Sequence, residues 1–255
     1  MLFILYAFFS QTFIPGNIYF DSTNYIEFRA GNLPIIISAP HGGDLEPSSF
    51  PIEIARAVQA FKMLIQNQFQ KVFTTLFLNK RGAFRLSLSI CLTGKSLMLT
   101  GRLLKLPMEI PRLKWLGTDI KPSSIQLKIV KDKTGLFLEL HGHARTIRRI
   151  ELGYLLTCSE LQLSDATIDS SSLVNDGSIR TLVANNVLNL SHSELLSGPA
   201  SFGTLLANEG FPSFPSTSYP FPQNGEPYFN GSYNIFQHGS QNNIGEIYAI
   251  QFELN

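Results

Sequence analysis

The stretch Gly135-Leu-Phe-Leu-Glu-Leu-His-Gly-His143 combines an apolar run with two terminal histidines. Residues 136–140 are apolar apart from Glu139 and have the length of a buried strand. In an open α/β sheet, side chains at the carboxyl ends of such strands line the crevice that binds ligands. His141 and His143 are therefore candidate functional residues. The alternative is a strand that stops in a polar turn, with both histidines solvated.

A second apolar run, Ile35-Ile-Ile-Ser-Ala-Pro-His41, also ends in a histidine, and the two glycines that follow permit a tight turn. The alternating stretch at 246–253 predicts a strand that ends in an acid, Glu253. Residues 17–30 are typical of a hairpin, and residues 52–70 have apolar positions at helical spacing. This mixture of strands and helices predicts an α/β domain.

Other segments are predicted with less structure. Residues 182–190 indicate a short helix, and the chain from Ser197 onward is rich in loop-forming residues before the last strand. Residues 74–124 follow neither the helical nor the strand period.

Composition limits the classes of function. The 255 residues are 44% hydrophobic and 15% charged, with a formal net charge of +1, which suits one globular domain. This balance gives no reason to expect nucleic acid or a membrane as partner, and it leaves the oligomeric state open. The two cysteines, Cys91 and Cys158, form neither a disulfide framework nor a cysteine-rich metal site, so any metal must be held by histidine and carboxylate.

The amino-terminal segment, residues 1–16, begins with an apolar run as long as a signal-peptide core and too short for a membrane-spanning helix. It lacks the basic residues that usually precede such a core, and no clean cleavage site follows. The segment is therefore either a signal peptide, which would imply secretion, or a plain amino-terminal extension. We expect residues 17–255 to form the domain itself.

The predicted strand ends bring together the donor types of a catalytic zinc site. Two histidines, His41 and His141, and one carboxylate would fill three positions of a tetrahedral site and leave the fourth for water. Such a site also needs an unligated carboxylate that takes the proton from this water. Glu253 could do so if the last strand lies beside the others. The alternative is that each histidine is a hydrogen-bonded turn residue.

Five motifs strengthen the zinc interpretation. They are Ser38-Ala-Pro-His-Gly-Gly43, Leu138-Glu-Leu-His-Gly-His143, Ser197-Gly-Pro-Ala-Ser-Phe-Gly203, Tyr228-Phe-Asn-Gly-Ser-Tyr-Asn234 and Ile250-Gln-Phe-Glu253. In this order they resemble motifs of the N-formylglutamate amidohydrolase family, which belongs with the zinc carboxypeptidases and aspartoacylases. The resemblance covers residues 17–73 and 125–255.

The resemblance implies a single-domain α/β/α sandwich with a mixed central sheet, like that of the zinc carboxypeptidases. It also implies one Zn²⁺ bound at the strand ends, and hydrolysis of an amide bond next to a carboxylate in an N-acyl amino acid or a peptide-like small molecule. His41 and His141 match the histidine ligands, and Asp44 fits the spacing of the acidic ligand, with Glu53 as the alternative.

The remaining family positions concern catalysis and substrate. Glu253 resembles the glutamate of the terminal strand that acts as general base. His143, Arg148 and His238 would line the substrate side, although Arg148 could equally be a solvated surface charge. Two positions depart from the family: Arg145 stands where relatives tend to have another histidine, and Ser232 replaces a usual glycine.

A larger departure concerns residues 74–124. Family members carry here an Asp-x-Asn-Arg segment that grips the substrate carboxylate, and arginine suits that task because it binds carboxylates bidentately. No such segment is present, but a shifted reading frame across residues 96–124 permits Asp-Ala-Asn-Arg at the expected place. We therefore predict that residues 74–124 are out-of-frame or disordered. An inactive product of a frameshifted gene, or a non-catalytic binding module on the same fold, is then an alternative to an active enzyme.

Overall fold

The computed structural model describes residues 14, 16–20, 26–30, 35–39, 89–93, 135–143, 145–223, 225–241 and 247–254. Three predicted site residues, His41, Asp44 and Glu53, lie outside these ranges, as do the predicted helix at 52–70 and residues 96–124. Within the described ranges, no helix combines the length and the apolar character needed to cross a membrane.

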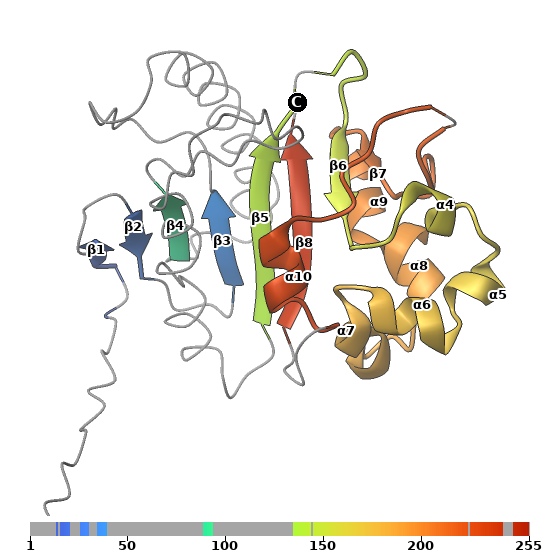
Figure 1. Cartoon of the computed structure of the whole chain (residues 1–255), viewed down its shortest axis with the longest axis horizontal. Coiled ribbons are helices and arrows are strands. Elements are labelled where there is room, and N and C mark those ends of the chain that lie inside the picture. The colour runs from blue at the N-terminus through green and yellow to red at the C-terminus, as the bar shows by residue number, and fades with distance from the viewer. Residues whose placement is uncertain are drawn as a thin grey trace, which may run out of the picture.

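A mixed sheet is the centre of the fold (Figure 1). Its eight described strands are ordered β1-β2-β4-β3-β5-β8-β6-β7. Their bounds are Ile18–Phe20 for β1, Ile26–Arg29 for β2, Ile35–Ala39 for β3, Ser89–Thr93 for β4, Gly135–Gly142 for β5, Ile150–Gly153 for β6, Ser213–Phe214 for β7 and Ile247–Leu254 for β8.

The four central strands, β4, β3, β5 and β8, run parallel to one another. The antiparallel strands β2 and β6 flank them, next to β4 and β8. The predicted strands β3, β5 and β8 are confirmed, and so is the hairpin, in which β1 and β2 pair antiparallel. Strand β4 forms within residues 74–124, where the sequence shows no strand period. The predicted α/β class is therefore confirmed.

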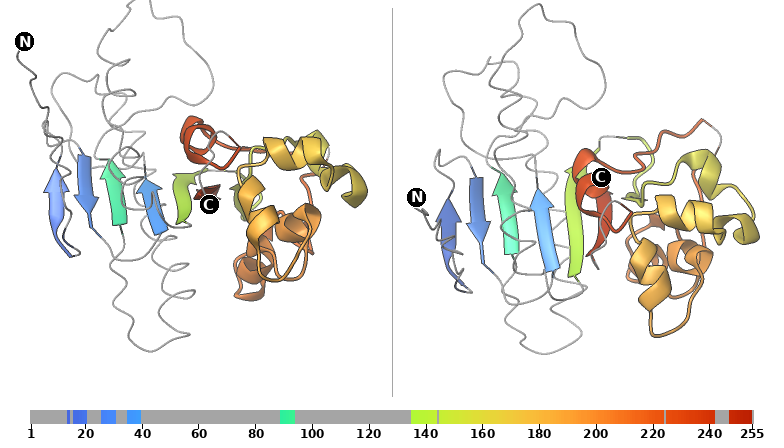
Figure 2. Two further views of the ribbon diagram at one scale, coloured as in Figure 1. Left: turned by 90° about the horizontal axis from the view of Figure 1, so that it is seen from below. Right: turned by 60° about the horizontal axis from the view of Figure 1, so that its bottom comes forward.

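Most of the described helices are short and gather at one end of the sheet, beside β6 and β7, as Figures 1 and 2 show. Helix α10, by contrast, lies against a face of β5 and β8 (Figure 2). The bounds are Cys158–Leu161 for α4, Asp165–Ile168 for α5, Ser171–Asp176 for α6, Arg180–Asn185 for α7, His192–Ser197 for α8, Phe202–Asn208 for α9 and Tyr233–His238 for α10.

The two faces of the sheet are covered by different helices because side chains alternate along each strand. On one face, Leu138 and Phe252 join a large apolar core with Leu196 of α8 and Leu206 of α9. The ring of Phe202 meets that of Phe252 edge-on, with centroids 5.4 Å apart. Each such side chain contributes about 1.5–3 kcal/mol when fully buried. This core holds β5, β8 and β6 in register.

On the opposite face, Ile235 of α10 packs against Phe137 and Ala249 and closes a smaller cluster. Helices α9 and α10, which cover opposite faces of the sheet, both begin in segments that the sequence predicts as loops. Their N-caps are serines: Ser201 accepts a hydrogen bond from the Thr204 amide, and Ser232 accepts one from the Ile235 amide. Local capping therefore starts two helices whose six or seven residues are too few to show a helical period.

Candidate functional site

A row of ionisable side chains crosses three strands on the face that α10 covers. The register pairs His141 of β5 with Glu253 of β8, and Glu253 in turn with Glu151 of β6. Paired residues point to the same face of a sheet, so the three side chains lie side by side. All three are buried. The sequence expectation that His141 and Glu253 meet at neighbouring strand ends is thus met.

The carboxyl group of Glu253 has a pKa near neutrality. Burial raises its pKa from 4.5 to about 7, with Glu151 adding to the rise, while His141, the Gln251 hydrogen bond and Arg145 oppose it. Gln251 donates from Nε2 to Oε1 of Glu253 at 2.5 Å. A carboxyl group with a pKa near neutrality can both take and return a proton at physiological pH.

Glu139, the single acid within the apolar part of β5, is fully buried beside His141. Its Oε2 lies 3.2 Å from Nε2 of His141. Ser232 donates a hydrogen bond to the same oxygen, and Asn234 donates to the other. A buried carboxylate requires such partners, so Glu139 is held in place on both sides.

The contact between Glu139 and His141 favours the charged forms of both groups. Burial acts to raise the pKa of Glu139, but the contact with His141 and the donors Ser232 and Asn234 outweigh it, so the pKa is lowered. Burial acts to lower the pKa of His141, but Glu139 and then Glu253 outweigh it, so the pKa is raised. The imidazole therefore sits between two carboxyl groups.

His143 follows the end of β5, and the backbone holds both of its ring nitrogens. The amide of Arg145 donates to Nδ1 at 3.2 Å, and Nε2 donates to the carbonyl of Arg149 at 3.1 Å. These bonds assign the proton to Nε2 and leave the ring neutral. Burial is the main cause that lowers the pKa of His143, and the positive charges of Arg145 and Arg149 lower it further. The hydrogen bond to the backbone carbonyl of Arg149 opposes this shift. Oε1 of Glu151 lies 3.8 Å from Nε2 of His143.

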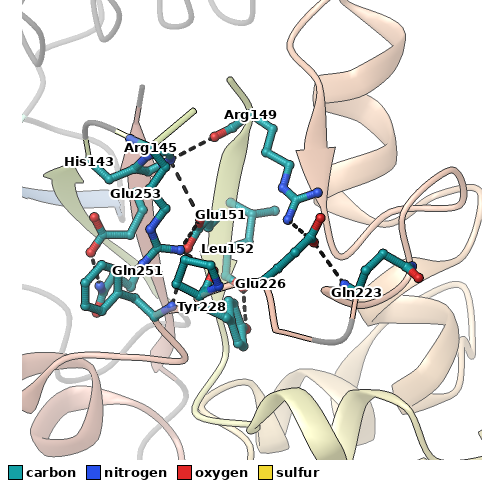
Figure 3. Close-up of polar contacts among 12 residues, drawn as sticks. His143, Arg145, Arg149, Glu151, Leu152, Gln223, Glu226, Tyr228, Gln251 and Glu253 are labelled. Atoms are coloured by element: carbon teal, nitrogen blue, oxygen red, sulfur yellow. Dashed lines mark hydrogen bonds and ion pairs between the residues drawn. The ribbon is translucent and has the colours of Figure 1, made fainter. Parts of the chain in front are cut away.

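Arg145 covers the Glu151 end of the row, as Figure 3 shows. Its guanidinium donates to Oε1 of Glu151 and to the carbonyl of Pro227. It also lies over the ring of Phe229, 4.5 Å from the centroid. Burial raises the pKa of Glu151, although Arg145 opposes the rise. Arg145 is therefore one of the cations that offset the charge of the two neighbouring carboxyl groups.

Arg149 fixes the loop that passes beside the site (Figure 3). It donates from Nη2 to Oε2 of Glu226 at 2.5 Å, and it lies over the rings of Phe214 and Tyr219, 4.2 and 5.8 Å from their centroids. The side-chain bond lowers the pKa of Glu226. Two arginines of the segment between β5 and β6 thus hold the loop before α10.

The other predicted substrate residues lie further from the row. Arg148 is exposed in the segment between β5 and β6. His238 packs edge-on against Phe137, with centroids 5.7 Å apart, toward the amino end of β5. The positions of both residues leave their roles toward substrate as predictions.

Glu151, Gln251 and Arg145 join the site without having been predicted as site residues. Glu151 lies in a strand whose residues are all buried, behind a basic stretch that hides the strand pattern. An acid between apolar residues, as in Ile150-Glu-Leu152, was the available signal. Only the pairing with β8 shows that it faces the site.

Comparison with known proteins leaves the family open. The chain matches no family model, no curated protein and no solved structure.

The described residues fit the chemistry of a zinc site in part. No group of three or more His, Cys, Asp or Glu side chains within the described ranges is arranged to hold a metal ion. Those ranges do supply one imidazole against a buried carboxylate, the usual support of a histidine ligand, and one carboxyl group at the neighbouring strand position. Imidazole and carboxylate are donors that Zn²⁺ accepts. Further ligands would have to come from residues outside the described ranges, where His41 and Asp44 lie.

Proposed function

We propose that this chain is a zinc-dependent hydrolase that cleaves an amide bond next to a carboxylate, in an N-acyl amino acid or a peptide-like small molecule. One observation carries the proposal: His141 and Glu253 occupy paired positions near the carboxyl ends of adjacent parallel strands. Both are buried, and each is supported by a polar neighbour two residues earlier on its own strand, Glu139 and Gln251.

His141, with His41 and Asp44 as the further ligands, would hold the metal. Bound Zn²⁺ would polarise the amide carbonyl and acidify a water molecule. Glu253 would take the proton of that water and return it to the leaving amine, because it occupies the strand position paired with His141. Gln251 would orient the carboxyl group through its hydrogen bond to Oε1.

The fold supports the same proposal at a coarser level. A mixed sheet with parallel central strands and helices on both faces is consistent with a sandwich like that of the zinc carboxypeptidases. The order of motifs that resembles the N-formylglutamate amidohydrolases adds to this, because the Leu138–His143 and Ile250–Glu253 motifs form neighbouring strands.

The test is hydrolysis by the purified, zinc-loaded chain. N-formyl, N-acetyl and N-succinyl amino acids with acidic, basic and apolar side chains would be supplied, and the released amine measured with an amine-reactive dye. We expect Glu253→Gln to lower kcat by about 100- to 10,000-fold, the usual range for a general base. Asp176→Asn, the same chemical change at an exposed carboxylate, should leave kcat unchanged.

Zinc content separates the alternatives. A chain that binds Zn²⁺ tightly but hydrolyses none of these compounds would favour a non-catalytic binding module. A chain that neither binds Zn²⁺ nor unfolds cooperatively would indicate a non-functional product, and the proposal would be wrong.

A further inference from the structure

We infer that Glu139 is a positioning residue, which fixes the ring of His141 for a metal ion, and that Ser232 and Asn234 fix Glu139 in turn. The role presupposes the zinc site proposed above. Glu139, Ser232 and Asn234 form one connected network beside His141.

Hydrogen bonds hold the Glu139 carboxylate on both of its oxygens. Glu139 has no exposed surface, so its charge would be costly without partners. Both of its oxygens accept a hydrogen bond from the start of α10, and Oε2 also faces Nε2 of His141 at 3.2 Å. The carboxylate therefore has no freedom to follow His141 if the ring turns. A ring whose Nε2 faces this carboxylate would make its metal bond with Nδ1.

Hydrogen bonds to the chain around the end of β6 hold the start of α10. The segment Tyr228–Asn234 crosses the end of β6 and is bonded to the chain that continues from it. The hydroxyl of Tyr228 donates to the carbonyl of Leu152 at 2.9 Å, and the amide of Leu155 donates to the carbonyl of Asn230 at 2.6 Å. Ser232 and Asn234 thus reach Glu139 from a segment that is fixed to the sheet.

Ser232 has two roles. Its hydroxyl donates to Glu139 and accepts from the amide of Ile235 at 3.1 Å. One side chain therefore starts α10 and orients the carboxylate. Asn234, in the first turn of α10, contributes only the second hydrogen bond.

Histidine ligands that lose such a carboxylate partner typically bind metal about 10- to 100-fold more weakly. We therefore expect Glu139→Gln to raise the zinc dissociation constant by about that factor, measured by competition with a chromophoric chelator. Asn234→Ala should raise it in the same direction by a smaller factor, although Asn234 does not touch His141. The Glu139→Gln/Asn234→Ala double variant should bind zinc no more weakly than Glu139→Gln, because both changes act through one carboxylate.

Ser201→Ala is the matched control for the N-cap. It removes the cap of α9, as Ser232→Ala removes the cap of α10, but it lies away from Glu139. Ser232→Ala should weaken zinc binding and Ser201→Ala should not. Equal dissociation constants for the wild type, Glu139→Gln and Asn234→Ala, with cooperative unfolding in all three, would overturn the positioning role while leaving the hydrolase intact.

A second measurement separates the positioning role from the proposed function. In the metal-free protein, nitrogen-15 NMR of the His141 ring reports whether Nε2 carries the proton that faces Glu139. We expect a protonated Nε2 in the wild type, and a clear shift of both ring nitrogens in Glu139→Gln and in Asn234→Ala. Unchanged ring resonances in both variants would overturn the role whether or not zinc binds. A wild type that binds no zinc but shows these shifts would reject the hydrolase and retain the contact network.

Discussion

Glu151 and Glu253 occupy directly paired positions on the antiparallel strands β6 and β8, so two buried carboxyl groups lie next to each other. Like charges at such positions repel, and burial penalises each of them further. The pKa values of both groups are raised accordingly, with burial as the largest cause. Arg145 offsets part of this cost at Glu151. Stability and pH dependence at the site follow from this arrangement.

Glu253→Gln should stabilise the metal-free protein at pH 8. In the folded protein the pKa of Glu253 is about 7, above the 4.5 of an unperturbed glutamate. The contribution of Glu253 to stability is therefore fully present below about pH 4.5 and is lost as the pH rises through 7. The rise corresponds to at most about 3 kcal/mol. Urea unfolding with a chelator present should therefore show a higher free energy of unfolding for the variant at pH 8 and a small difference at pH 5. An equal difference at both values would contradict the shift.

Arg145→Met should lower the free energy of unfolding at pH 8 by about 1–3 kcal/mol, because it leaves the buried Glu151 carboxylate without its guanidinium partner. The loss should shrink at pH 5, where Glu151 can take up a proton. Arg148→Met is the matched control, since Arg148 is exposed and such a change usually stays within about 0.5 kcal/mol. Equal losses in the two variants, measured by urea unfolding, would argue against the pair.

Gly153→Ala should disturb the segment that carries Ser232. A Cβ at Gly153 would lie 2.7 Å from the backbone carbon of Asn230, and backbone cannot yield as a side chain can. We expect a loss of about 2–3 kcal/mol from overpacking, together with weaker zinc binding. Gly210→Ala is the comparison: its Cβ meets nothing, and only the left-handed backbone at φ +88° costs about 1 kcal/mol. If the two variants lose the same stability and bind zinc equally, the backbone of Asn230 does not exclude a side chain at position 153.

His192→Gln should flatten the loss of stability in mild acid. His192 is fully buried, and burial lowers its pKa from 6.5 against the opposing effects of the Ile168 carbonyl and Asp169. Its contribution to stability is thus present above about pH 6.5 and is lost as the pH falls through the lowered folded pKa. Unfolding measured at several values between pH 7.5 and 5 should fall more steeply in the wild type. Parallel curves for wild type and variant would show that another group titrates.

The strands were predictable because their signal is local. Apolar runs at residues 35–39 and 136–140 and the alternation at 247–253 identify β3, β5 and β8 without any knowledge of their partners. Helices α9 and α10 were not predictable in the same way, because six or seven residues show no period and their N-cap serines occur equally in loops.

The positions of His141 and Glu253 near the carboxyl ends of buried strands can be read from the sequence, since the chemical nature and spacing of residues along one segment are enough for that. The positions of Glu151 opposite Glu253, and of Ser232 and Asn234 beside Glu139, emerge only when the chain folds. These contacts depend on strand order, register and the path of the segment before α10. The packing of segments far apart in the chain sets all three, and no local pattern encodes them.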